Sequence, residues 1–470
     1  MKLAVVVQRY GADISGGAEL HARYIAERLA RHAQVEVLTT RASDYITWRN
    51  ELPAGEERVN GIVVRRFPVA RRRNVVEFGH RSRFVFEHPH TIAEELRWLN
   101  SQGPRSHALI RHIRKVESEF DFFIFFSFRY YHAYHGARAV PGKAILVPTA
   151  ERDAVLGLDI FGPVFRGVRA IMYNSHEERA MIDAVSRRRG PGVVVGVGSN
   201  IPERPQPGRF RKKYGVHRPF AIYVGRIDVN KGCGEMFDFF QKYAARAPRG
   251  LDLILVGSKH LDVPAHPRIK HLGFLPEEDK FDAIAAADVL IMPSPYESLS
   301  MVTLEAWALG RPALVNARCD VLRGQSARSN AGLFYENVEE FCEGLFALES
   351  TGPAGPVLGR NGREYFRRNY TWPVIERKYL DMFDRLKREP QQAAMEPMPG
   401  WFARRRRVLP PIRSWTPCRQ ARCADAAGAP GPRLARVRRC HWQSRTRHTT
   451  GAGGRRIRIR DHCGVGRSAA

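Results

Sequence analysis

This 470-residue sequence lacks long apolar runs. A helix that crosses a membrane needs about 18 consecutive apolar residues. The longest run here, residues 120–128, is shorter than that and is interrupted by Asp121. The opening residues, 1–7, are also too short a stretch for a signal peptide, and their apolar composition predicts a first buried strand. We therefore expect a soluble, cytoplasmic protein.

Cysteine is scarce as well, at seven residues, and four of these lie beyond residue 400. The other three, Cys233, Cys319 and Cys342, are scattered through the chain. Scattered cysteines provide neither a disulfide framework nor the regular spacing of a metal site. The cysteine pattern therefore fits a reducing cytoplasm.

Two motifs of cofactor and metal enzymes are missing. No G-x-G-x-x-G follows the first predicted strand, which argues against a dinucleotide-dependent dehydrogenase. No D-x-D follows a predicted strand either. We therefore expect the protein to use neither a cofactor nor a metal ion.

Residues 401–470 contain no lysine, 18 arginines and only two acidic residues. This segment carries more than half of the chain's formal charge of +28, so the rest of the chain is only moderately basic. Because helical periodicity also vanishes, we predict a disordered Arg-rich tail over residues 389–470. One interpretation is a basic arm for a membrane or nucleic acid. The other is that the segment resembles out-of-frame translation of GC-rich DNA.

The most informative stretch is residues 293–312, PSPYESLSMVTLEAWALGRP. It follows an apolar run, residues 288–292, that predicts a buried strand, and residues 299–309 suit a helix that a glycine ends. This helix is apolar on nearly every face, which indicates burial, and Glu305 is its one charged residue. Glu297 precedes the helix, whose amino-terminal N–H groups attract anions, phosphate above all.

The pattern P-x-x-E-S-x-x-M-x-x-x-E-A-x-A-x-G-x-P in this stretch closely resembles the nucleotide-sugar motif of retaining glycosyltransferases of family 4, which have the GT-B fold. The resemblance implies that Glu305 binds the ribose hydroxyls of a nucleotide. It places Glu297 at the donor sugar, and the backbone amides of Ser300, Met301 and Val302 on the diphosphate. Alternatively, Glu305 pairs with a buried base such as Arg311, and Glu297 is a solvated loop acid.

A glycine pair follows the first predicted strand, residues 2–7. Gly16 and Gly17 open a helix, and a second strand over residues 35–39 completes a βαβ unit. Glycines at such a junction let the backbone approach a ligand and aim helix N–H groups at it. The pair resembles the glycine loop that family-4 enzymes carry near the diphosphate and the acceptor, although such junctions are often only tight turns.

The second half opens with a similar junction. The strand predicted at Phe220–Val224 leads into Gly225 and Arg226, and Lys231 with a further glycine follows five residues after the arginine. This G-R…K-G arrangement is the second resemblance to family 4. It implies that the Arg226 guanidinium binds two phosphate oxygens and that the Lys231 ammonium adds a positive charge beside them. Gly257, at the end of a later strand, is implied to face the nucleotide. The alternative is two surface cations beside a turn.

The acceptor side departs from the family pattern. The histidine expected at the end of strand Phe122–Phe126 falls on Phe126 itself. His132 or His135 could replace it from the following loop, although loop histidines are more often polar surface. After the next strand, a second family histidine corresponds to Glu151.

Arginines cluster in residues 65–83, between the glycine pair and the Gly225 junction. A patch of this kind docks an anionic membrane surface or a charged acceptor, although a solvated surface is the commoner explanation. The cluster comprises Arg65, Arg66, Arg71, Arg72, Arg73, Arg81 and Arg83.

Alternating strands and helices predict an α/β protein with parallel sheets in both halves, and a cleft at the carboxyl ends of the strands. We expect an amino-terminal Rossmann-like acceptor domain over residues 1–202 and a Rossmann-like donor domain over residues 203–363. A helix over residues 364–388 is expected to cross back to the first domain, as in the GT-B fold.

The resemblance implies a metal-independent retaining glycosyltransferase, which moves a sugar from a nucleotide-diphosphate sugar to a saccharide or lipid-linked acceptor. Peripheral contact with the inner membrane face is compatible with the basic patch, whereas nucleic acid is a less favoured partner. The alternative is a non-catalytic GT-B-like protein that binds a nucleotide or a polyanion such as nucleic acid. A GT-B phosphorylase or epimerase is disfavoured, because the two-glutamate pattern is typical of the transferases.

Overall fold

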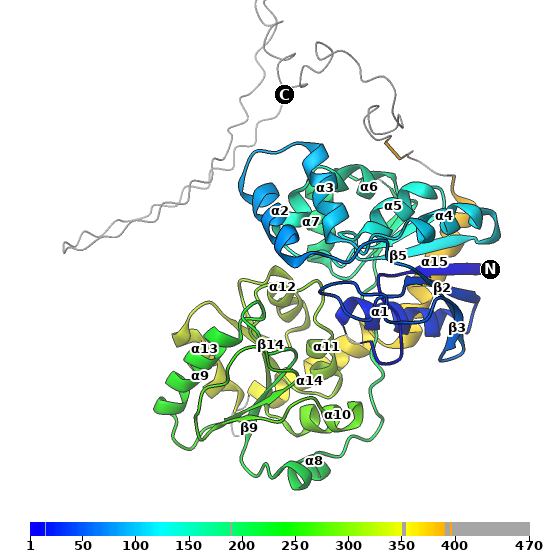
Figure 1. Cartoon of the computed structure of the whole chain (residues 1–470). Coiled ribbons are helices and arrows are strands. Elements are labelled where there is room, and N and C mark those ends of the chain that lie inside the picture. The colour runs from blue at the N-terminus through cyan, green and yellow to red at the C-terminus, as the bar shows by residue number, and fades with distance from the viewer. Residues whose placement is uncertain (15, 189, 350–353, 391–394, 397–470) are drawn as a thin grey trace, which may run out of the picture. The chain divides into compact units, whose positions relative to one another are not determined.

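Two lobes, each built on its own β-sheet, make up the described chain (Figure 1). All the described residues belong to one compact unit, Met1–Pro397. Apart from residues 389, 390, 395 and 396, the predicted tail lies outside the described residues. The computed structural model describes residues 1–14, 16–188, 190–349, 354–390 and 395–396.

The first lobe contains an eight-stranded sheet in the order β3-β4-β2-β1-β5-β6-β7-β8. Neighbouring strands are parallel except for β3 and β4, which form an antiparallel hairpin. The strands are β1 (Lys2–Val6), β2 (Gln34–Thr40), β3 (Gly55–Val59), β4 (Ile62–Phe67), β5 (Phe122–Phe126), β6 (Ala144–Val147), β7 (Ala170–Tyr173) and β8 (Gly192–Val194).

The second lobe contains a six-stranded sheet, β11-β10-β9-β12-β13-β14, in which every pair is parallel. The predicted parallel sheets in both halves are therefore confirmed. The strands are β9 (Phe220–Val224), β10 (Asp252–Val256), β11 (Ile269–His271), β12 (Val289–Met292), β13 (Ala313–Asn316) and β14 (Gly332–Tyr335).

Helices connect the strands in both lobes. Those of the first lobe are α1 (Gly17–Leu29), α2 (Val75–Glu87), α3 (Ile92–Gln102), α4 (His107–Lys115), α5 (Tyr131–Ala139), α6 (Phe161–Gly167) and α7 (His176–Ser186). The later helices are α8 (Pro207–Tyr214), α9 (Cys233–Arg246), α10 (Glu277–Ala286), α11 (Met301–Ala308), α12 (Asp320–Ser329), α13 (Val338–Leu348), α14 (Ala354–Asn369) and α15 (Trp372–Arg388). The boundary predicted at residue 202 falls between β8 and α8.

Short apolar runs form the central strands. All five residues of β5, FFIFF, are buried, and so are all four of β12, VLIM. Continuous apolar runs fit parallel strands that helices cover on both faces. Helix starts follow capping residues: α3 begins after Thr91, whose hydroxyl accepts a hydrogen bond from the Glu94 N–H in a capping box.

Each sheet has a point at which the strand order reverses. In the first sheet β1 lies between β2 and β5, and in the second β9 lies between β10 and β12. Ligands of doubly wound sheets bind at the carboxyl ends of the strands beside such a switch point. The loops that follow β1, β5, β9 and β12 are therefore the first place to look for a site.

The last two helices connect the lobes. α14 packs against α11 of the second lobe, whereas α15 packs against α1 of the first. Within the first lobe, Phe383 of α15 stacks on Phe122 of β5 with ring centroids 5.5 Å apart. Residues 364–388, predicted as one helical segment, thus divide between α14 and α15, and the helix break falls at Tyr370 and Thr371.

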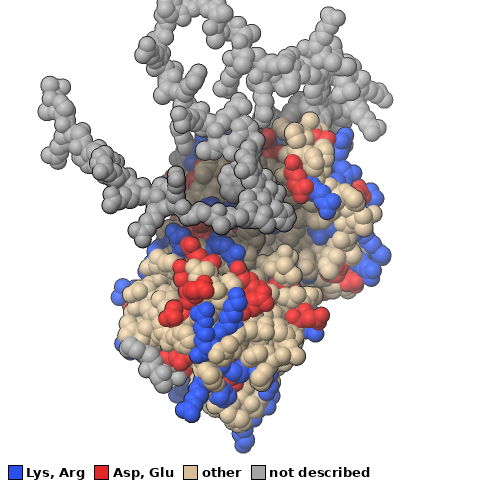
Figure 2. Space-filling view, turned by 90° about the vertical axis from the view of Figure 1, so that its left-hand side faces the viewer, with Lys and Arg blue, Asp and Glu red and all other residues tan. Residues whose placement is uncertain are grey.

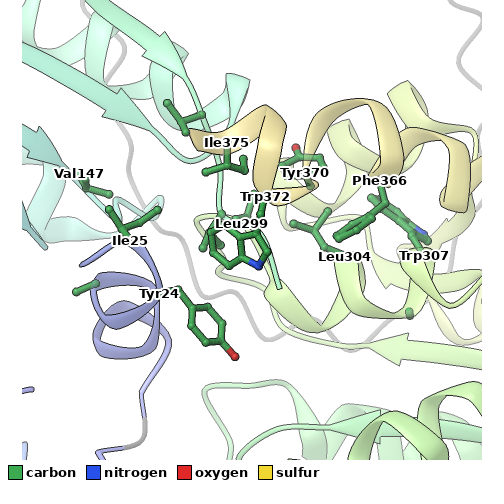
Figure 3. Packing of buried hydrophobic residues seen from close by; sticks show 14 of the residues in the cluster. Tyr24, Ile25, Val147, Leu299, Leu304, Trp307, Phe366, Tyr370, Trp372 and Ile375 are labelled. Carbon is green, nitrogen blue, oxygen red and sulfur yellow. The ribbon is translucent and has the colours of Figure 1, made fainter. Parts of the chain in front are cut away.

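Trp372, at the start of α15, lies where the two lobes meet. Its ring is edge-on to Tyr24 of α1, with centroids 5.6 Å apart, and its Nε1 donates to the Asn200 side chain at 2.9 Å. Figure 3 shows Trp372 among apolar side chains that include Ile25 of the first lobe and Leu299 of the second. One hydrophobic cluster thus runs through both lobes and fixes the cleft between them.

Residues 41–119 contain elements that the sequence did not predict. They contain two helices, α2 and α3, and an extra strand, β3, that the sequence analysis missed. The β3–β4 hairpin turns at Asn60 and Gly61, both with positive φ, and Asn-Gly is a common pair in two-residue hairpin loops. Among the described helices, none is long and apolar enough to cross a membrane.

Candidate active site between the two lobes

A cleft of about 430 Å³ lies between the lobes at the carboxyl ends of the strands. The loops after β1, β5, β6 and β7 line it from the first lobe, and the loops after β9 and β12 line it from the second. Asn174 donates across it to the Ser298 hydroxyl at 3.4 Å. Lining residues used below are Gly17, His21, Ser127, Arg129, Tyr130, Thr149, Glu151, Gly225, Lys231, Glu297, Ser300, Met301 and Val302.

Lys231 and Glu297 form an ion pair in this cleft, with Nζ 2.6 Å from Oε1. Burial alone would lower the pKa of Lys231, but the adjacent carboxylate outweighs burial, so the net pKa is raised. Gly232 has φ +72° and lies so close to the Pro293 carbonyl that a Cβ would sit 2.4 Å from its oxygen. This close packing of two loops is what brings the pair together from positions 66 residues apart.

Arg226 lies beside the cleft and outside the residues that line it. Its guanidinium pairs with Asp228 and donates to the Tyr45 hydroxyl of the first lobe at 3.0 Å. Asp228 also accepts from the Lys231 backbone N–H at 2.8 Å, so one carboxylate orders the whole turn. The sequence analysis implied a phosphate partner for Arg226, whereas here it bridges the two lobes.

Gly225 lines the cleft, but Gly257 lies behind it. A Cβ on Gly257 would sit 2.0 Å from the Gly225 carbonyl oxygen. Gly257 thus packs directly against the Gly225 turn, and its implied role of facing a nucleotide stays a prediction.

We expect Gly257→Ala to destabilise the second lobe more than Gly273→Ala. Both glycines have positive φ, which costs an alanine about 1–2 kcal/mol. Only Gly257 adds a steric clash, since the structure places no described atom within 4 Å of a Cβ at Gly273. Overpacking adds about 1–3 kcal/mol. Urea denaturation of both variants measures the difference, and equal losses would contradict the proposed contact.

The amino-terminal end of α11 faces the cleft with its backbone. Ser300, Met301 and Val302 line the cleft, and no side chain caps the helix. The Ser300 hydroxyl instead shares a hydrogen bond with the Thr303 hydroxyl at 2.8 Å. The first N–H groups of a helix have no intrahelical acceptor. Free N–H groups of this kind suit an anion, and the sequence predicts an anion site at this helix start.

Glu305 is buried in α11, at 2% exposure, and does not line the cleft. Its Oε1 accepts from the Ser199 hydroxyl at 2.8 Å and from Lys280 Nζ at 3.0 Å. Lys280, rather than Arg311, is thus the base that pairs with it. Oε2 is buried with no hydrogen-bond partner among the described residues. A buried oxygen without a donor is costly, so this atom is an acceptor whose hydrogen-bonding capacity is unmet.

Three cleft residues have strained backbones. Ser127, Thr149 and Ser300 have φ of +63°, +50° and +65°, the left-handed region that non-glycine residues rarely adopt. The hydroxyls of Ser127 and Thr149, which follow β5 and β6, lie 2.9 Å apart. Such strain clusters at functional sites. The sequence analysis missed both residues, since nothing in a single sequence marks a serine or threonine as left-handed.

His132 and His135 are not in the cleft, which corrects the predicted acceptor-side role. They lie on helix α5, where a loop was expected. His132 is fully buried, and its Nε2 bonds the Phe126 carbonyl at 2.9 Å. His135 packs on the Tyr131 ring with centroids 4.2 Å apart. Burial lowers the pKa of His132 to about 4 and that of His135 to about 3.

His21, which the sequence analysis missed, does line the cleft. It lies on α1, four residues after Gly17, and its ring meets Phe126 edge-on with centroids 5.1 Å apart. Burial lowers its pKa to about 3, so the imidazole is neutral at pH 7. Its Nε2 has no partner in the described part of the chain. A histidine thus reaches the end of β5 from a helix, beside the position that Phe126 occupies.

Glu151 is at the cleft, as predicted for the acceptor side. Burial raises its pKa; nearby Arg129 opposes that rise, and Glu297 adds to it. Arg129 is held by Asp153, with Nη2 2.6 Å from Oδ2. Across the described residues, no three His, Cys, Asp or Glu side chains come together as metal ligands would.

The two glycines after β1 have different roles. Gly17 lines the cleft. Gly16 has φ +145°, and a Cβ there would sit 2.4 Å from Glu19 Oε2. Glu19 in turn pairs with Arg9, Nη2 to Oε1, at 2.6 Å. Gly16 therefore leaves room for this buried ion pair, which fixes the start of α1.

Residues 218–350 match the model of a family described as glycosyl transferases group 1. Over 193 residues the chain is 26% identical to mannosylfructose-phosphate synthase from Agrobacterium fabrum, and this match covers 37% of the chain. The chain spans less than half the length of this curated relative, 42% of it. Both motifs of the second lobe lie inside the matched family region.

Solved structures match over a larger share of the chain. A sucrose-phosphate synthase from Thermosynechococcus elongatus matches with a TM-score of 0.61 at 16% identity, over 82% of this chain and 99% of that one. HepE from Anabaena, in complex with UDP-glucose, matches with a TM-score of 0.57 at 16% identity, over 82% and 100%. These likenesses confirm the predicted fold: the chain has the GT-B architecture of two lobes with parallel sheets.

Proposed function

We propose that this chain is a glycosyltransferase, which moves a hexose from a nucleotide-diphosphate sugar to a saccharide or lipid-linked acceptor. One observation carries the proposal: Lys231 and Glu297 are paired beside the uncapped amino end of α11, in a cleft that both lobes line. Cation, carboxylate and free amides together suit a ligand with an anionic part and a polyhydroxyl part.

In this proposal, the diphosphate contacts the amides of residues 300–302 and the Lys231 ammonium. Negative charge builds on the diphosphate as the glycosidic C–O bond breaks, so fixed donors and cations there stabilise the transition state. Glu297 contacts hydroxyls of the donor sugar, and Glu305 accepts from the ribose hydroxyls. The partnerless Oε2 of Glu305 supports that last role.

The proposed reaction is retaining and needs no metal ion or cofactor. The leaving phosphate helps to take the acceptor's proton during front-face attack, as the resemblance to family 4 implies. Lys231 and the helix amides supply the neutralising charge. Arg226 joins them if it turns away from Asp228. Closure of the lobes about the Trp372 junction would expel water and limit hydrolysis of the donor.

The comparisons support a nucleotide-sugar donor. HepE, a fold neighbour, is described in complex with UDP-glucose. Mannosylfructose-phosphate synthase is named for a sugar product. We infer a UDP- or GDP-sugar for this chain from these likenesses together with the two motifs of its second lobe.

A panel of UDP- and GDP-sugars tested by thermal shift, followed by assay of nucleotide release, tests the proposal. At 100 times its Kd, a ligand stabilises the folded state by about 2.7 kcal/mol, so a true donor raises the melting temperature. We expect one nucleotide class to do so and to be turned over. No shift with any donor, together with nucleic-acid binding that weakens steeply with salt, would favour the non-catalytic polyanion-binding alternative.

A further inference from the structure

A second cavity, of about 220 Å³, lies in the first lobe and is lined by arginines. Glu77 is the one acidic residue among those that line it, and its remaining walls are neutral. The cavity therefore carries a formal charge of about +5, which exceeds that of any other described cavity. Its arginines are Arg71, Arg72, Arg73, Arg81, Arg97 and Arg105.

Four of these arginines have partners: Arg71 pairs with Glu77 at 3.5 Å, Arg105 donates to the His107 imidazole at 3.0 Å, and Arg73 and Arg81 are held more closely. Arg73 donates through Nε and Nη2 to the Gln102 carbonyl at 3.0 and 2.6 Å, and its guanidinium lies 4.7 Å from the centroid of the Trp48 ring. Burial lowers its pKa to about 10, so it stays charged at neutral pH. Arg81 is held by Glu77, with Nη2 2.9 Å from Oε1.

Arg72 and Arg97, by contrast, have no hydrogen bond or ion pair among the described residues, and both are exposed. Holding several guanidinium groups around one small cavity is repulsive. A bound anion would relieve that repulsion. Because the planar fork of arginine matches two oxygens of a phosphate group, phosphate suits this cavity better than a carboxylate of single charge does.

The arginine cavity adjoins the cleft. The Trp48 ring, which lines the cavity, lies edge-on to the Tyr130 ring, which lines the cleft, with centroids 5.6 Å apart. Arg73 also donates to the carbonyl of Tyr45, whose hydroxyl accepts from Arg226. The arginine cavity and the cleft are therefore neighbours, and this pair of rings forms the wall between them.

We infer that the acceptor carries a phosphate group and that the arginine cavity holds it. This inference rests on the proposed function and names the chemical class of its acceptor. Arg65 and Arg66 of the predicted basic patch are instead neutralised by Glu36 and Glu57. Two arginines of the patch are thus paired with glutamates, whereas Arg71, Arg72, Arg73 and Arg81 line the cavity.

The phosphate can come from a free sugar phosphate or from a lipid headgroup. α2, which borders the cavity, exposes Val75 and Val76 at 49% and 69%, and Phe84 and Phe86 at 40% and 38%. These side chains suit a lipid source, whereas the small volume of the cavity suits a soluble phosphate. Both sources share the same chemistry at the arginines.

Paired charge reversals test the inference. R72E/R97E alters two cavity arginines that hold no described side chain in place. R83E/R111E changes the net charge of the same lobe equally, at exposed positions outside the cavity. In titrations with glucose 6-phosphate at low salt, we expect R72E/R97E to weaken binding on the order of tenfold or more, and R83E/R111E to match the wild type. Similar behaviour of the two variants would overturn the inference.

A second arm uses vesicles of phosphatidylcholine with phosphatidylglycerol, compared with phosphatidylcholine alone. If R72E/R97E weakens only the binding of glucose 6-phosphate, the phosphate group comes from a soluble ligand. If it weakens only the binding of the phosphatidylglycerol vesicles, the phosphate group comes from a lipid. Either result supports the arginine cavity. If both double variants weakened binding equally in both arms, the binding would come from a general basic surface, which would contradict the assignment of the arginine cavity.

The same variants separate this inference from the proposed function. R72E/R97E is expected to keep the wild-type affinity for UDP, because its substitutions lie outside the cleft. If no donor binds the wild type, while R72E/R97E still binds glucose 6-phosphate more weakly than the wild type does, the cavity assignment stands and the transferase proposal fails. If donors are turned over while R72E/R97E binds phosphate normally, the transferase proposal stands and the cavity assignment fails.

Discussion

Replacing Lys231 by alanine is expected to lower kcat for sugar transfer about 10²–10³-fold. Its ammonium is the one that Glu297 holds in the cleft, 2.6 Å from the carboxylate. In the proposed reaction it stabilises charge that grows on the leaving diphosphate. The loss should therefore fall mainly on kcat rather than on donor KM. Steady-state rates of nucleotide release, measured at saturating acceptor, give this value.

Lys259→Ala is the matched control for Lys231→Ala. Lys259 belongs to the same lobe and pairs with Asp262 at 3.3 Å, but it lies outside the cleft. The Lys259→Ala variant should have the kcat of the wild type. Because Lys231→Ala also leaves Glu297 without its partner, the melting temperature of the variant is measured beside its rate. A rate near that of the wild type for a folded Lys231→Ala protein would remove Lys231 from the mechanism.

Glu305→Gln is expected to weaken nucleotide-sugar affinity by about 1–3 kcal/mol, the value of a hydrogen bond to a charged group. This corresponds to a rise in Kd of about 5- to 150-fold. The substitution keeps the shape of a side chain that is 2% exposed, so packing in α11 changes little. It removes the charge that the ribose hydroxyls would meet. Calorimetric titration with the donor identified in the panel measures the change.

Asp282→Asn serves as the control for a buried acid in the same lobe. Asp282 is 1% exposed and accepts from the Gln206 N–H and the Arg209 Nε, each at 2.6 Å, away from the cleft. Its loss should reduce stability without affecting donor affinity. Glu305 would be only a structural residue if Glu305→Gln lowered the melting temperature as Asp282→Asn does and left the donor Kd unchanged.

The sequence predicted the strands because their signal is local. β5 and β9 were predicted with the bounds that the structure has, since each is a short apolar run. Asp121 and Ser127 flank β5, and Pro219 and Gly225 flank β9. The pairing of Lys231 with Glu297 was accessible only through the resemblance of two separate motifs, because 66 residues lie between them.

Other features depend on tertiary contacts that no local pattern records. His21 has a functional position only because α1 packs its ring against Phe126 of a strand distant in sequence. The pairing of Glu305 with Lys280 rests on the packing of α10 against α11. α2 was missed because its arginine-rich face obscures helical periodicity. The Asn60-Gly61 turn, however, was a local signal that could have revealed β3.

The position of UDP in a crystal structure of its complex tests the central claim most directly. The account predicts diphosphate oxygens within hydrogen-bond distance of the amides of residues 300–302 and of Lys231 Nζ. It also predicts the ribose hydroxyls on the Glu305 carboxylate. UDP bound outside the cleft, or seated in it with its ribose away from Glu305, would contradict the account.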